Sequence, residues 1–283
     1  MIKQFDSFDL SVRQDEISNF LLIDGLVAIK NFITLAECRE YLLLCLDIEK
    51  RFAEEGGQLA YNGTVISHPF TYNRRFLQLS CNKYIHGIIK RSIGDSPILV
   101  NSNINNRQIN FNGIEVSAPG ASWHTDSRYI QQGKVRIGHS FGYQFCVCIS
   151  DFNVKNGATQ FIEKSHLDTT RPSRELDETL YQFKTIELNA GDAFIFDTGL
   201  WHRSGPPGNS PRWSCFNFYG PWYFKPYFNY SRMFSSEDIK NFDDTTLDLL
   251  HFTSEPPVFQ VPRSKTLLTP DEFRKEKAFG DKI

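Results

Sequence analysis

Short apolar segments separated by turn signals fill the middle of the sequence, and they limit the folds that this chain can adopt. Alternating polarity recurs between about Ser96 and Tyr219, and dipeptides such as Asn156-Gly157 and Gly191-Asp192 interrupt it. Alternation places successive side chains on opposite faces of a strand, and such dipeptides favour turns. The predicted strands are 25–29, 98–100, 109–111, one within 139–149, 158–162, 185–188, 193–196 and 212–219. So many short strands predict a mainly β fold with flanking helices around a double-stranded β-helix, or jelly roll.

The first third and the end of the sequence carry the helical patterns. Thr34 is followed by Glu37 at the spacing of a capping box, and apolar residues then repeat at helical intervals to Glu54, where Gly56-Gly57 ends the helix. Further helices are predicted over 15–22, 82–94 and 234–251, a polar loop or lid over 57–76, and a peripheral tail over about the last 30 residues. We expect a single domain over 1–283, with an N-terminal part at about 1–95, the jelly-roll core at about 96–230 and a C-terminal helix and tail at about 231–283.

Composition excludes several classes of protein. The formal net charge is −2, so there is no basic excess to suit a nucleic-acid backbone. The longest apolar runs, at 20–23 and 41–46, are too short to span a membrane, and the N-terminus lacks the apolar core of a signal peptide. The six cysteines show no CxxC spacing, and alternation puts Cys146 and Cys148 on one face of a strand. We interpret them as buried thiols and expect a reducing, cytoplasmic setting.

Two His-x-Asp triplets are candidates for metal binding. In Trp123-His124-Thr125-Asp126 the two potential ligands are two residues apart, so on a strand or strand edge they share a face and can point to one metal. His166-Leu167-Asp168 has the same spacing. We interpret this rival as a structural histidine at a strand end, followed by a charged loop. The spacing alone does not choose between the two triplets.

His202 is the candidate third ligand, because it follows the predicted strand 193–196 after a short loop. Two histidines and one carboxylate on one face of an octahedron form the ligand set of non-haem Fe(II) oxygenases. Arg212 begins the next alternating strand. If that strand pairs antiparallel with the one leading to His202, the guanidinium lies near the metal and suits a carboxylate; the alternative is a surface arginine.

The order of these elements resembles the phytanoyl-CoA dioxygenase family of Fe(II)/2-oxoglutarate-dependent oxygenases, from about Phe20 to Tyr223. The resemblance rests on the opening strand and helix, Pro119-Gly120 before the first triplet, Asn156-Gly157, Gly191-Asp192, Trp201-His202-Arg203-Ser204 and Arg212. It implies that His124, Asp126 and His202 bind iron, that Arg212 pairs with the distal carboxylate of 2-oxoglutarate, that Ser204 hydrogen-bonds it, and that Gln144 or Gln160 makes a further contact. One departure is Glu163-Lys164-Ser165-His166, where the family has Pro-Gly-Ser-His.

The resemblance also implies a reaction. Fe(II), 2-oxoglutarate and O2 would be the cofactors, and an unactivated C–H bond of a small-molecule metabolite would be hydroxylated or otherwise oxidised, with a biosynthetic pathway as one setting. Asp126 favours oxidation over halogenation, because halogenating relatives replace the carboxylate with a small residue. The alternatives are a jelly-roll metalloenzyme without 2-oxoglutarate (an isomerase or another dioxygenase) and a non-catalytic binding module. The expected lids are 56–75, 127–140 and 165–183, and the arginines within the first two either attract an anionic group or are solvated: Arg74, Arg75, Arg128 and Arg136. The sequence leaves the substrate and the oligomeric state open.

Overall fold

The computed structural model describes residues 2–57, 63–94, 96–107, 121–126, 140–168, 172–173, 176, 181–208 and 210–254. The strand predicted at 109–111, Arg128 and Arg136 of the expected lids, and most of the predicted C-terminal tail lie outside these residues. The strands are β1 Lys3–Asp6, β2 Leu26–Lys30, β3 Thr64–Ser67, β4 Pro97–Arg107, β5 Tyr143–Cys148, β6 Thr159–Phe161, β7 Lys184–Thr185, β8 Ala193–Asp197, β9 His202–Ser204 and β10 Arg212–Pro221. The α-helices are α1 Asp9–Val12, α2 Gln14–Asp24, α3 Leu35–Glu54, α4 Pro69–Tyr72, α5 Leu77–Ser80, α6 Lys83–Ile93, α7 Ser236–Lys240 and α8 Asp244–Leu249. Short 3-10 helices are η1 Arg74–Phe76, η2 Val154–Asn156, η3 Ser165–Leu167 and η4 Tyr230–Arg232.

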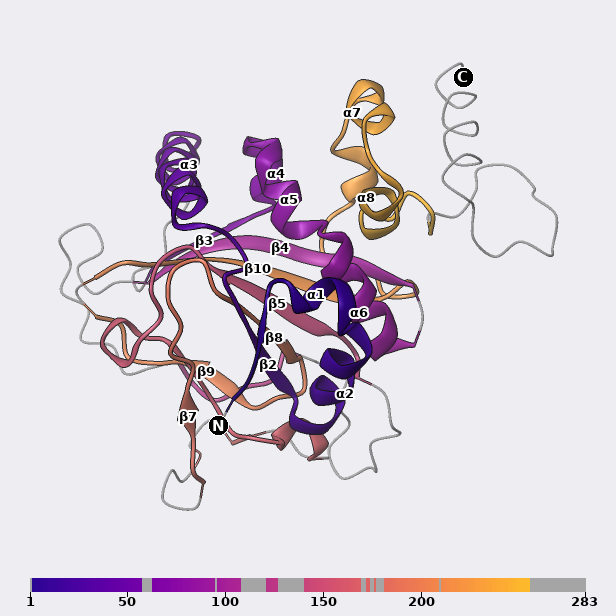
Figure 1. The fold of residues 1–283 in the computed structure, drawn as a ribbon. Helices are drawn as coiled ribbons and strands as arrows, with labels where there is room; N and C mark the ends of the chain where they lie inside the picture. The colour runs from indigo at the N-terminus through magenta and orange to yellow at the C-terminus, as the bar shows by residue number, and fades with distance from the viewer. Residues whose placement is uncertain are drawn as a thin grey trace.

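Two sheets form the body of the molecule, and together they make the predicted jelly roll. The larger has the strand order β1-β2-β8-β5-β10-β4-β3, in which only the β1–β2 pair is parallel; the smaller has the order β7-β6-β9 and is antiparallel. Helices α3, α4, α5, α7 and α8 cover one face of the larger sheet, and β7 and β9 lie on its opposite side (Figure 1). The site described below therefore has a sheet on each side.

Alternation along the strands divides the apolar residues between two cores. In β2 and β8, Val27 and Ile195 pack toward the helices, while Leu26 and Phe196 belong to a second cluster that also contains Phe161 of the smaller sheet. Because both faces of the larger sheet are covered, its strands β2, β5 and β8 are mainly apolar. A polar or charged side chain on the inner face therefore needs a specific reason to be there.

The long helix α3 begins and ends as the sequence predicts. Thr34 accepts a hydrogen bond from the backbone N–H of Glu37, and the Glu37 carboxylate accepts one from the backbone of Thr34, which completes the capping box. Gly56 adopts a φ of 85°, and the N–H groups of Gly56 and Gly57 donate to the carbonyls of Ala53 and Phe52 at 3.1 and 2.8 Å. This is the Schellman arrangement, in which a glycine takes the left-handed conformation past the helix end.

Two element predictions were wrong. The segment 57–76 is not simply a loop, because it contains β3, α4 and η1; β3 pairs with β4 as an edge strand and buries only Thr64 and Ile66, a signal too short to detect. The single helix predicted over 234–251 is two short helices, since Asp243 caps a new helix at the backbone N–H of Thr246. Strand β1 was missed. Among the described helices, none is both long enough and apolar enough to cross a membrane.

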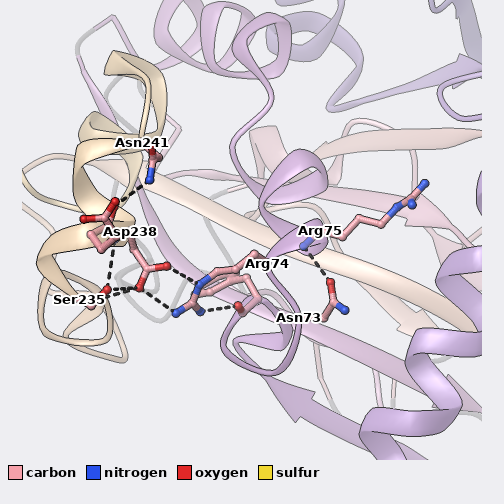
Figure 2. A network of polar contacts seen from close by, with 8 residues as sticks. Asn73, Arg74, Arg75, Ser235, Asp238 and Asn241 are labelled. Atoms are coloured by element: carbon pink, nitrogen blue, oxygen red, sulfur yellow. Dashed lines mark hydrogen bonds and ion pairs between the residues drawn. The ribbon is translucent and has the colours of Figure 1, made fainter.

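An ion pair joins η1, in the first third of the chain, to α7 near its C-terminal end (Figure 2). The Arg74 guanidinium donates to both carboxylate oxygens of Asp238, at 3.1 and 3.2 Å. The same carboxylate accepts from the backbone N–H and hydroxyl of Ser235, which forms a capping box at the start of α7. Arg75 pairs with Glu40. The carboxylates beside both arginines favour a structural role over attraction of an anionic ligand.

Replacing Asp238 with alanine should destabilise the protein without affecting the site between the sheets. The variant loses the Asp238 half of the capping box and an exposed bidentate ion pair, which together contribute about 1–2 kcal/mol to the free energy of unfolding. At this chain length the melting temperature should fall by roughly 2–8 °C. Glu237→Gln is the matched control, because Glu237 lies beside Asp238 and its carboxylate pairs, among the described residues, with exposed Lys240; it should change stability by less than about 0.5 kcal/mol.

The difference in stability between wild type and Asp238→Ala should depend on pH. Hydrogen bonds from Arg74, and then from Ser235, lower the pKa of Asp238 to about 2. The pKa of Asp238 is therefore lower in the folded protein than in the unfolded chain. Its ionised carboxylate contributes fully to the free energy of unfolding above about pH 4, and this contribution is lost as the pH falls through about 2. Thermal melts of wild type and Asp238→Ala should therefore differ at pH 7 and converge in strong acid. A difference that stays constant down to pH 2 would contradict the assigned ion pair.

Candidate metal centre

A cavity of about 420 Å³ lies between the two sheets, and the residues predicted to bind a metal line it. His124 and His202 exchange two backbone hydrogen bonds of 3.0 Å each, so they form an antiparallel bridge beside β9. Asp126, two residues after His124, is held by a hydrogen bond from its backbone N–H to the carbonyl of Thr198. One potential ligand atom from each of these three residues lies within 4.8 Å of the others.

Backbone carbonyls fix the orientation of both imidazole rings. The Nδ1 atoms of His124 and His202 lie 2.8 Å from the carbonyl oxygens of Ser122 and Leu200. Because a carbonyl oxygen can only accept, each Nδ1 carries a hydrogen, and Nε2 is the nitrogen whose lone pair is available in the neutral form of the ring. The Nε2 atoms lie 3.8 and 3.5 Å from the carboxylate oxygens of Asp126. Burial lowers the pKa of His202 to about 4, so this ring is neutral at pH 7 and able to bind a metal.

Gln144 positions the carboxylate of this cluster. Its Nε2 donates to Oδ2 of Asp126 at 2.9 Å, and its own backbone is held in the centre of the larger sheet by β10 and β8. A second residue that hydrogen-bonds a ligand restricts the ligand's rotation and adjusts its basicity. Gln160, the other glutamine considered from the sequence, instead accepts a hydrogen bond from Nε of Arg203 at 2.7 Å.

Arg212 projects into the same cavity and is 2% exposed. Its guanidinium carbon lies 4.4 Å from the ring centroid of Phe152, while its Nε and Nη1 atoms are buried and make no hydrogen bond within the described part of the chain. Arg107 stands opposite it in the β4–β10 register. Burial, with a smaller contribution from Arg107, lowers the pKa of Arg212 to about 10, so the group is still charged at pH 7. A buried cation whose N–H groups lack acceptors is costly, and an anion in the cavity that accepted from Nε and Nη1 would offset that cost.

The strand that carries Arg212 pairs differently from the prediction. We expected its strand to pair with the one leading to His202, but β10 lies between β5 and β4, and β8 pairs with β2 and β5. Arg212 faces the cavity because it shares the inner face of β10 with Phe216 and Phe218. Alternation fixes which residues share a face, but strand order depends on contacts between distant segments.

Of the remaining residues considered from the sequence, Ser204 lies in the cavity and His166 does not. Ser204 lies two residues after His202 on β9 and lines the cavity. The rival His166 lies on η3, is 2% exposed, and approaches the carbonyl of Leu22 at 3.1 Å through Nε2. Its ring fills the space where a Cβ on Gly25 would lie. Among the described residues, the cluster of His124, Asp126 and His202 is the one group suited to hold a metal ion.

Sequence reasoning missed one wall of the cavity. Asn101, Asn103 and Asn105 alternate along β4 and line the cavity, together with Arg107. The signal was present as three asparagines at every second position, directly after an apolar run. It was overlooked because asparagine is uncommon inside strands and normally indicates a turn.

The fold and this cluster define a jelly-roll protein with the donor set of a non-haem Fe(II) oxygenase, two imidazoles and one carboxylate, and with a buried cation nearby. Residues 23–212 match the family model for phytanoyl-CoA dioxygenase (PhyH). The chain belongs to the phytanoyl-CoA dioxygenase family. It is an Fe(II)/2-oxoglutarate-dependent oxygenase, an enzyme class whose cofactors are iron, 2-oxoglutarate and O2.

Solved structures support the same fold. The epimerase SnoN in complex with Fe3+, alpha ketoglutarate and nogalamycin RO superposes with a TM-score of 0.60 and 15% identity, covering 76% of this chain and 87% of that one. The carbocyclase SnoK from nogalamycin biosynthesis gives 0.60 and 14%, covering 77% and 88%. HygX from Streptomyces hygroscopicus, with nickel and 2-oxoglutarate bound, gives 0.58 and 13%, covering 75% and 89%. At these identities the likeness establishes the jelly roll.

Proposed function

We propose that this enzyme binds Fe(II) through His124, Asp126 and His202 and hydroxylates an unactivated C–H bond of a small molecule. The observation that carries the proposal is the combination of two oriented Nε2 atoms, one carboxylate and the buried guanidinium of Arg212 in one cavity, where its Nε and Nη1 have no hydrogen-bond partner among the described residues. Neutral imidazoles and a carboxylate suit Fe(II), and a guanidinium suits a carboxylate. The same cavity can therefore hold both a metal ion and an anionic cosubstrate.

The residues of the cavity have separate roles in this proposal. Arg212 would pair with the distal carboxylate of 2-oxoglutarate, and Ser204, on the neighbouring strand β9, would hydrogen-bond it. Gln144 would hold Asp126 in its ligating orientation through the 2.9 Å hydrogen bond. When bound together, iron, 2-oxoglutarate and O2 supply the oxidant for the C–H bond. The buried ring of Phe196, whose centroid lies 4.8 Å from that of His202, would limit access of water to the metal side of the cavity.

The carboxylate of Asp126 favours hydroxylation or a related oxidation over halide transfer, because it occupies a position that a halide would need. Structural neighbours named as an epimerase and a carbocyclase show that other outcomes occur on this fold. Their place in nogalamycin biosynthesis supports a small-molecule substrate and a biosynthetic setting for this chain. Six cysteines that are buried and free within the described structure support our expectation of a reducing, cytoplasmic location.

An anaerobic titration of the Fe(II) protein with 2-oxoglutarate tests the proposal. We expect the charge-transfer absorption of the iron–2-oxoglutarate chelate to appear in the wild type, and succinate to be released once O2 and a substrate are supplied. Metal binding without this absorption would instead support the alternative of a jelly-roll metalloenzyme that does not use 2-oxoglutarate. Failure to bind Fe(II) would contradict both the proposed 2-oxoglutarate-dependent oxygenase and the alternative metalloenzyme.

A further inference from the structure

One wall of the cavity carries a row of uncharged amides. Asn101, Asn103 and Asn105 occupy alternate positions on β4, are half-buried, and line the cavity that contains the metal cluster. The residues between them, Ser102 and Ile104, are fully buried on the opposite face. We call the three residues the asparagine ladder. Its regular spacing places all three side chains on the face that a bound substrate would contact.

The ladder is not explained by the protein's own hydrogen bonds. The Oδ1 atoms of Asn101, Asn103 and Asn105 are buried and have no hydrogen-bond partner in the part of the chain that the structure describes. Leaving a buried polar atom unsatisfied costs roughly 1–3 kcal/mol. Asparagine is also unfavourable in strands. Three such residues in one row would therefore destabilise the sheet unless a ligand provides their partners.

Aromatic rings lie directly beside the ladder. In the β4–β10 register Phe218 stands opposite Asn101, and Phe216 stands opposite Asn103. Both rings line the cavity, as does Tyr227, whose ring centroid lies 6.4 Å from that of Phe218. The wall thus alternates amide groups with apolar ring surfaces. Such a surface suits a molecule that has hydroxyl groups on its edge and C–H groups on its face.

We propose that the substrate is a neutral polyhydroxylated molecule, a sugar, glycoside or cyclitol, whose hydroxyl groups bind the asparagine ladder. The inference rests on the proposed function, since it places the oxidised carbon beside the metal cluster. The ladder spans about 13 Å from Asn101 to Asn105, so one hydroxyl group cannot satisfy it. A cationic ligand is disfavoured by Arg107 and Arg212, and an acyl chain offers no donors to the amide oxygens.

Calorimetric binding of a defined set of compounds tests the inference. The probes are methyl glucopyranoside, phenyl glucopyranoside, lactose and myo-inositol, with octanoate as the acyl comparison. Each is titrated into the anaerobic protein loaded with Fe(II) and 2-oxoglutarate, and again into the metal-free protein. We expect at least one polyol to bind and octanoate not to bind. The free sugar, the glycoside and the cyclitol are compared to identify which form of the polyol is preferred.

Leucine is nearly the same size as asparagine and cannot hydrogen-bond. Asn103→Leu, and independently the pair Asn101→Leu with Asn105→Leu, should weaken polyol binding at least about tenfold without lowering the melting temperature. Asn217→Leu is the matched control, because Asn217 is fully buried on the other face of β10 and its Oδ1 also has no partner among the described residues. It should leave polyol binding within about twofold of wild type.

The outcomes separate the inference from the proposed function. If the chelate absorption appears but no polyol binds, or octanoate binds in preference to every polyol, the inference is overturned and the proposed function stands. Equal polyol affinity in wild type and the ladder variants also overturns it. If polyols bind the metal-free protein through the ladder but the chelate absorption is absent, the proposed function fails and the polyol site remains.

Discussion

Arg212→Met should abolish 2-oxoglutarate binding and, in the absence of the cosubstrate, make the protein more stable. Arg212 is a fully buried cation whose Nε and Nη1 lack partners within the described residues, and it faces Arg107 across the strand pair. Replacing a buried charge of this kind with an apolar side chain of similar length should increase the free energy of unfolding by about 1–4 kcal/mol. Losing a bidentate contact to a carboxylate should weaken 2-oxoglutarate binding by at least about 100-fold.

Two measurements check this prediction. Thermal melts without 2-oxoglutarate give the change in stability, and an anaerobic titration of the Fe(II) protein gives the affinity for 2-oxoglutarate, while metal affinity should stay near that of wild type. Arg91→Met is the matched control, because Arg91 is exposed and pairs with Asp15 on the surface; it should neither stabilise the protein nor affect the cosubstrate. A less stable Arg212→Met variant with unchanged 2-oxoglutarate affinity would contradict the assigned role.

His202→Ala and His166→Ala should have opposite effects. Removing His202 deletes one of three proposed ligands, so Fe(II) affinity should fall by at least about 100-fold and the chelate absorption should vanish, with little loss of stability. Removing His166 deletes a buried ring that fills the space beside Gly25 and contacts the carbonyl of Leu22. That variant should lose roughly 2–4 kcal/mol of stability and retain its metal.

Metal binding by calorimetry and thermal unfolding of both variants check this pair. His124→Ala should behave like His202→Ala, because the two rings are oriented by the same kind of carbonyl contact. If His166→Ala loses metal affinity but melts like wild type, the metal site would instead be the triplet His166-Leu167-Asp168. Retention of full affinity in His202→Ala would remove the proposed third ligand.

The helix caps and strands that were predicted correctly share a local cause. The capping box of Thr34 and Glu37 and the alternation of β5, β8 and β10 depend on residues a few positions apart, so the sequence contains them directly. Strand β3 was missed because its pairing partner β4 lies more than 30 residues away and the segment itself buries little. The same reason explains the wrong strand order around β10.

Local patterns in the sequence predict the residue types of the site and the strand faces that carry them: a histidine and a carboxylate two residues apart, a distal histidine, and an arginine on an alternating strand. Three features are visible only in the folded protein: the backbone bridge between His124 and His202, the hydrogen bond from Gln144 to Asp126, and the asparagine ladder on the same cavity. Each of them joins segments that are distant in the sequence. Side-chain direction follows from the two-residue period of a strand, whereas convergence on one cavity requires long-range pairing that no local pattern encodes.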